Sequence, residues 1–193
     1  MRSYDGGEDA WVGVGLAYGI TDDIELGGLV LPVRLDESDI DDLEFYGRFR
    51  FVDGPFELGA QVTLQLPTYT ELGLGLGLPM LAHAGRRLRI DTGFEIEMLF
   101  WEPETVVNLD VPLAFTWDVG RQGFFGPRTG FYVWNGDTVL FPAGIHGGGT
   151  VARGQLDITG WFMWPALLAT DRDDDPFDVR TIEIGFGLNA RVR

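Results

Sequence analysis

The sequence predicts an all-β fold and, within that class, an antiparallel up-and-down barrel. The first observation is a two-residue alternation of side chains, as in FELGAQVTLQL (56–66), where every even position is apolar. The second is that no long stretch repeats apolar residues at the i, i+3, i+4, i+7 spacing of an amphipathic helix. The third is length: several alternating segments run for about 10 to 14 residues, whereas a strand usually has about 5–6. Strands this long are typical of barrels, and about 9–11 tilted residues suffice to cross a bilayer.

Eleven strands follow one another along the chain, and turn residues separate them. They are predicted at 11–20, 24–35, 43–52, 56–67, 73–84, 88–100, 105–119, 124–134, 138–152, 155–168 and 179–192. Short connections rich in Gly, Asp and Pro lie at Thr21–Asp23, Asp53–Pro55, Gly85–Arg87, Gly120–Gly123 and Arg153–Gly154. Longer connections alternate with them at 36–42, 68–72, 101–104, 135–137 and 169–178. This regular alternation of short and long connections indicates consecutive hairpins.

The two faces of the predicted strands differ in chemistry. One face is bulky and apolar, with Val62 in the fourth strand, Ile96 in the sixth and Phe186 in the last. The other is small or charged, with Thr63 and Glu95 as examples. Two architectures fit this pattern: a soluble barrel or sandwich with the apolar face inward, and a membrane barrel with that face toward lipid.

Aromatic side chains on the apolar face favour the membrane barrel. They gather near strand ends, at Tyr18, Phe51, Phe56, Phe115 and Trp117 on one side and at Phe100 and Trp164 on the other. Amphipathic rings settle at the headgroup level of a bilayer, whereas a soluble core would hold them in mid-strand. We therefore expect a transmembrane β-barrel whose partner is the lipid bilayer. A soluble lipocalin-like binding barrel, with the faces reversed, is the alternative.

Composition limits the number of domains and the kinds of partner and site that the protein can have. The chain has 193 residues and no linker or composition shift, which predicts a single domain over 1–193. Its 30 acidic and 14 basic residues give a net charge of −16, the wrong sign for binding nucleic acid through phosphates. It contains no Cys, which excludes disulfides and thiolate metal sites.

The segment YGITDDIELG (18–27) joins an outward aromatic at a strand end, a tight acidic turn and the start of a new strand. It resembles the hairpins of porin-like Gram-negative outer-membrane barrels, including the channel-like family associated with phenol-degradation pathways. The resemblance implies a bacterial outer-membrane location, with short turns toward the periplasm and long loops outside. Because bacterial single-chain barrels have an even number of strands, we expect a twelfth, N-terminal strand, with residues 1–8 as the remnant of an outer loop. An odd barrel closed by its parallel first and last strands is the alternative.

No residue pattern points to catalysis, so we do not expect an enzyme. Ser3 and Ser38 are the only serines and lie outside the predicted strands, which leaves no credible nucleophile for a Ser–His pair. Glu95 and Glu97 share the polar face and could serve as acid and base. We expect Arg89 and neighbouring arginines to neutralise them instead.

No cofactor or metal site is expected either. His83 and His146 lie on polar faces of separate strands, and their spacing offers no third metal ligand. The alternate aspartates of 171–175 resemble part of a calcium loop, but Pro176 stands where glycine is needed. The glycines of LGLGLGL (72–78) lie within a strand, where they thin the inner wall or let the barrel bend.

The polar face predicts a wet lumen lined by charges. The inward residues are Glu44, Arg48, Arg50, Glu57, Arg89, Asp91, Glu95, Glu97, Asp110, Asp118, Arg128, Asp157, Glu183 and Arg191. Nine are acidic and five basic, and the acidic loops 36–42 and 171–178 add negative charge at one mouth. We expect a pore for passive passage of small solutes or ions with a weak preference for cations. A plugged structural barrel that displays its acidic loops is the alternative from another class.

Overall fold

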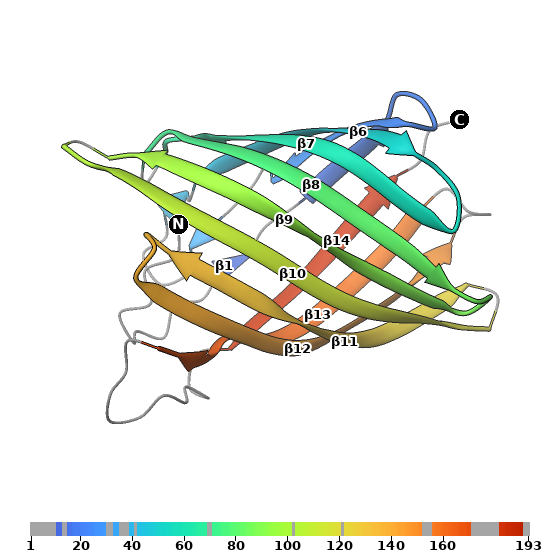
Figure 1. The fold of residues 1–193 in the computed structure, drawn as a ribbon. Coiled ribbons are helices and arrows are strands. Elements are labelled where there is room, and N and C mark those ends of the chain that lie inside the picture. The colour runs from blue at the N-terminus through green and yellow to red at the C-terminus, as the bar shows by residue number, and fades with distance from the viewer. Residues whose placement is uncertain are drawn as a thin grey trace.

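The structure is a computed structural model that describes residues 11–12, 15–29, 33–34, 39–40, 42–68, 71–101, 103–120, 122–151, 156–170 and 182–190. Its main element is an eleven-stranded antiparallel sheet that curls into a nearly closed barrel of tilted strands (Figure 1). Each strand of this sheet pairs with the next one along the chain. The all-β, up-and-down barrel expected from the alternation is therefore confirmed.

Most of the predicted strands appear close to their expected bounds. The sheet consists of β2 (Gly15–Gly19), β3 (Ile24–Leu29), β6 (Leu43–Val52), β7 (Phe56–Leu66), β8 (Gly73–Ala84), β9 (Leu88–Phe100), β10 (Thr105–Val119), β11 (Gly123–Trp134), β12 (Thr138–Val151), β13 (Leu156–Ala169) and β14 (Glu183–Ala190). Short turns and longer connections alternate between these strands. The short turns therefore lie at one end of the barrel and the longer connections at the other. We call these the short-turn end and the long-loop end.

Two predicted strands are shorter than expected. A separate three-stranded sheet contains β1 (Trp11–Val12), β4 (Val33–Arg34) and β5 (Asp39–Ile40), so 11–20 and 24–35 each contribute to two sheets. The small sheet lies at the long-loop end, because β2 and β3 meet in the turn Thr21–Asp23 at the other end.

The barrel has one seam, between β2 and β14. These strands are the two edges of the large sheet, lie side by side and run in the same direction, because nine antiparallel strands separate them. Within the described residues no ladder joins them. The twelfth strand stays a prediction, and residues 1–8 lie outside the described residues.

Cross-strand pairing sorts the side chains onto two faces. Gly47, Val62, Leu76 and Ile96 are consecutive partners and lie on the outer face. The adjacent row contains Arg48, Gln61, Gly77, Glu95 and Asp110 and lies on the inner face. Register shifts interrupt the ladders at Arg50/Val52 and at Phe141/Ala143. Apart from these shifts, the period of two seen in the sequence is kept across the sheet.

The apolar face points outward. Large hydrophobic side chains are exposed on every one of the eleven strands of the barrel, and Val62, in the middle of β7, is 50% exposed. This arrangement is opposite to that of a soluble binding barrel, whose apolar face lines the interior. The soluble lipocalin-like alternative is therefore wrong in its assignment of the faces.

The inside of the barrel is packed differently at its two ends. At the long-loop end the inner face carries buried apolar residues, among them Leu99 beside Val106, and Leu140 beside Ala169. Glycines elsewhere on the inner wall leave room for large neighbours. A Cβ at Gly185 would collide with the Trp161 ring. The expected thinning of the inner wall is seen at Gly75 in β8, where a Cβ would meet the Glu95 carboxylate.

Candidate functional site

The structure describes thirteen of the fourteen charged residues expected to face inward, and Arg191 lies outside the described residues. All thirteen occupy strand positions whose partners lie on the inner face. Cross-strand pairing also places Glu25 there, opposite Arg48, although the sequence left its register open. The described inner face therefore carries ten carboxylates against four arginines. That these side chains line a conducting lumen stays a prediction.

A cavity toward the short-turn end has a volume of about 520 Å³. We call it the arginine cavity, because its lining includes Arg48, Arg50, Arg89 and Arg128. Among the described residues, two carboxylates, Glu57 and Asp91, line the same cavity. The overall negative balance of the inner face is thus locally reversed.

The four arginines differ in how their charge is matched. Arg89 donates through Nε to Asp91 at 2.9 Å. Arg48 donates through Nε and Nη2 to the neutral Gln61 amide oxygen at 3.0 and 2.7 Å, while Glu25 lies 3.8 Å from its Nη1. Arg128 makes no hydrogen bond or ion pair within the described part of the chain. Arg48 and Arg128 therefore have no carboxylate at hydrogen-bond distance.

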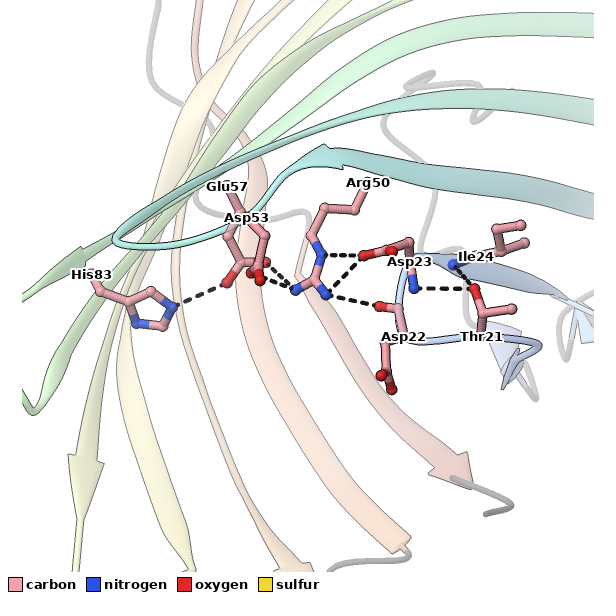
Figure 2. Close-up of polar contacts among 8 residues, drawn as sticks. All are labelled: Thr21, Asp22, Asp23, Ile24, Arg50, Asp53, Glu57 and His83. Atoms are coloured by element: carbon pink, nitrogen blue, oxygen red, sulfur yellow. Dashed lines mark hydrogen bonds and ion pairs between the residues drawn. The ribbon is translucent and has the colours of Figure 1, made fainter.

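Arg50, which lines the arginine cavity, also joins two of the short turns, as Figure 2 shows. Its Nε and Nη2 donate to Asp23 Oδ1 at 3.1 and 3.0 Å, and Nη2 also donates to the Asp22 carbonyl at 3.0 Å. Its Nη1 lies 3.0 Å from Glu57 Oε2 and 3.3 Å from Asp53 Oδ1. One guanidinium thus connects the β2–β3 and β6–β7 turns.

The network extends to neighbouring turns at both sides. Glu57 Oε1 lies 3.2 Å from His83 Nε2, near the β8–β9 turn, as Figure 2 shows. In the β2–β3 turn, the Thr21 hydroxyl oxygen accepts from the backbone N–H groups of Asp23 at 3.2 Å and Ile24 at 3.0 Å. These hydrogen bonds fix the turn with Asp23 next to Arg50. The acidic turn singled out in the sequence therefore links β2 and β3 to β6 at the short-turn end.

The second cavity lies toward the long-loop end and has a volume of about 170 Å³. We call it the carboxylate cavity, because its lining includes Glu44, Glu95, Glu97 and Asp110. The Thr63 hydroxyl donates to Glu95, and Asn108 Nδ2 donates to Glu97 at 3.0 Å. The expectation that Arg89 neutralises this pair is wrong, because Arg89 pairs with Asp91 instead. Asp91 lies two residues from Arg89 on the same face of β9, whereas Glu95 lies six residues away, about 20 Å along the strand.

Neither His83 nor His146 lies in a cluster of described side chains that could bind a metal ion. His83 contacts Glu57, and His146 Nε2 lies 2.9 Å from the Thr116 hydroxyl. Among the described residues, no group of three or more His, Cys, Asp or Glu side chains could hold a metal ion.

The inner face also carries aromatic residues that the sequence did not single out, among them Tyr46, Phe124 and Trp161. Tyr46, whose hydroxyl donates to Glu25 at 3.0 Å, lies near the carboxylate end, whereas Phe124 and Trp161 line the arginine cavity. The signal that could have found them is their position: each falls on the polar face of an otherwise alternating strand.

Comparison with known proteins found no matching family model, curated protein or solved structure. None of the described residues forms a helix long and apolar enough to cross a membrane.

Proposed function

We propose that this protein is a barrel of the bacterial outer membrane that lets small solutes and ions pass through its polar interior, with a weak preference for cations. The observation that carries the proposal is the outer surface. It exposes large apolar side chains on all eleven strands. A surface of this kind is unfavourable in water and suits the hydrocarbon core of a bilayer.

The chemistry of the outer face supports lipid contact in a second way. Within the described strands of the barrel, no charged side chain occupies an outer position. Two outer polar groups, the Thr92 and Thr129 hydroxyls, donate to the carbonyls of Pro112 and Pro142, each at 2.9 Å. Polar groups facing lipid need such internal partners, because hydrocarbon offers none.

Aromatic residues near the short-turn end support an interfacial position for that end. Phe49 and Phe51 have ring centroids 6.4 Å apart, as do Phe115 and Trp117, and Trp117 and Phe125. Rings in such a girdle sit at the headgroup level of a membrane. Together with the resemblance of 18–27 to outer-membrane hairpins, this favours an outer membrane with the short turns toward the periplasm.

Passive passage needs no catalytic step. It needs a polar path whose charged side chains set the electrostatic preference for ions. Ten carboxylates against four arginines on the described inner face favour cations. The two cavities supply polar space at successive depths.

A plugged structural barrel is the second candidate. The buried cluster of Leu140, Ala166 and Ala169, with Tyr132 packed against it, occupies the inner face near the long-loop end. Such a cluster would favour closure of that mouth over passage.

Planar-bilayer conductance separates the two. The purified protein should give discrete current steps in KCl, and under a salt gradient the reversal potential should have the sign of cation preference. Heat-unfolded protein is the control. Folded, inserted protein that carries no current would support the plugged barrel, and protein that stays dispersed without detergent would contradict membrane insertion.

A further inference from the structure

We propose that the arginine cavity is a binding site for a small organic anion, a carboxylate with an apolar body. The inference deepens the proposed pore function and rests on it, since the ligand would reach the cavity through the barrel mouth at the short-turn end. The site lies apart from the carboxylate cavity, which is nearer the long-loop end.

The charge of the cavity favours an anion. Four guanidinium groups face two carboxylates there. Arg50 and Arg89 are held by those carboxylates, whereas Arg48 donates to the neutral Gln61 amide with Glu25 3.8 Å away, and Arg128 makes no hydrogen bond or ion pair in the described part of the chain and interacts with Asp110 only at longer range. Guanidinium groups bind carboxylates through charge-assisted hydrogen bonds, and Arg128 has all its donors available.

The rest of the lining favours an apolar body on that anion. Leu81 pairs with Asp91, Phe124 with Asp118 and Trp161 with His146, so all three face inward, and all three line the cavity. The Trp161 ring is fixed by a hydrogen bond from Nε1 to Glu183 at 2.7 Å. At about 520 Å³ the cavity falls within the range of about 300–1,000 Å³ typical of small-molecule sites.

Access also favours an anion from one side. Arg50, which lines the cavity, pairs with the Asp23 carboxylate of the β2–β3 turn and the Asp53 carboxylate of the β6–β7 turn, so the cavity begins beside the short-turn end and those turn carboxylates already have a guanidinium partner. The carboxylates Glu44, Glu95 and Glu97 lie further along the barrel. A carboxylate ligand that enters at the short-turn end can therefore reach the arginine cavity without first passing the carboxylate cavity.

Isothermal titration calorimetry on the protein in lipid nanodiscs tests the site, with empty nanodiscs subtracted. Hexanoate should bind saturably, and acetate about tenfold more weakly or worse, because it lacks the buried methylenes. Hexylammonium should give no saturable binding. Arg128→Gln should weaken hexanoate binding about tenfold or more, through loss of charged hydrogen bonds. Arg86→Gln, the same charge change in the exposed β8–β9 turn, should leave binding unchanged.

Folding of each variant is checked by far-ultraviolet circular dichroism, and Arg48→Gln replaces Arg128→Gln if the latter does not fold. Absence of saturable hexanoate binding, or equal binding by the Arg128 and Arg86 variants, would overturn the site. Conductance of the same protein in KCl without hexanoate keeps the two proposals distinct. A conducting protein that does not bind hexanoate refutes the site alone, and a binding protein that does not conduct refutes the pore alone.

Discussion

Arginine at position 62 tests which face of the barrel meets lipid. Val62 lies in the middle of β7, pairs with Gly47 and Leu76, and is 50% exposed on the outer face. An arginine on the lipid face costs about 2–4 kcal/mol at the bilayer midplane and about 0–1 kcal/mol near the interfaces. Val62→Arg should therefore lower the equilibrium constant for folding into a bilayer about 30- to 700-fold.

Two control variants show whether the cost of Val62→Arg comes from its depth in the membrane and its position on the outer face, rather than from introducing an arginine anywhere in the barrel. Val119→Arg places the same change at the end of β10, on the outer face at 53% exposure, and should cost little because it reaches the interface. Thr63→Arg places the charge on the inner face, next to Glu95, and should cost less than Val62→Arg. Urea titrations of the protein reconstituted in vesicles give the free energies of unfolding. Equal costs at Val62 and Thr63 would refute the assignment of faces, and equal costs at Val62 and Val119 would refute the membrane depth.

Other predictions concern the charges inside the barrel. Glu95→Gln with Glu97→Gln should shift the reversal potential under a salt gradient away from cation preference, since both line the carboxylate cavity, and an unchanged potential would exclude them from the conducting path. Because the arginine and carboxylate cavities lie in series, an open pore should rectify, with more current when the long-loop side is positive; symmetric current-voltage curves would show that this segregation has no effect. Arg50→Gln should lower the free energy of unfolding by about 1–3 kcal/mol, mainly through loss of the Glu57 ion pair, because the exposed Asp23 and Asp53 contribute little. Denaturant titration measures this loss, and a loss below about 1 kcal/mol would contradict a stabilising role for the network.

The barrel could be predicted from the sequence because its signal is local. In β7, every residue from 56 to 66 carries the period of two, so both the strand and its faces follow directly. Strand 24–35 shows the limit of such reasoning. Apolar residues continue to Val33 in the sequence, but Val33–Arg34 pairs with another sheet rather than with the barrel. Gly27 and Gly28 also blur the alternation, so the sequence alone does not assign Glu25 to either face.

The site was predictable only in part, because partners depend on register. The sequence places Arg48, Arg89 and Glu95 on the polar face, but the offset between strands decides which side chains meet. The sequence therefore predicts only the total charge of the inner face, whereas the structure places the four described arginines around one cavity and Glu44, Glu95, Glu97 and Asp110 around another. Arg50 meets Asp23 only because the first and second short turns lie side by side at one end of the barrel.

The most direct test of the central claim is a scan of lipid and water accessibility along β7. The chain contains no Cys, so single cysteines at positions 58 to 65 can each carry one spin label in protein reconstituted into vesicles. Oxygen, which concentrates in the hydrocarbon core, should relax labels at even positions, with a maximum near Val62, while a water-soluble nickel reagent should relax labels at odd positions such as Thr63. The reverse phase, or no alternation at all, would contradict a barrel with its apolar face in lipid and its charged face in water.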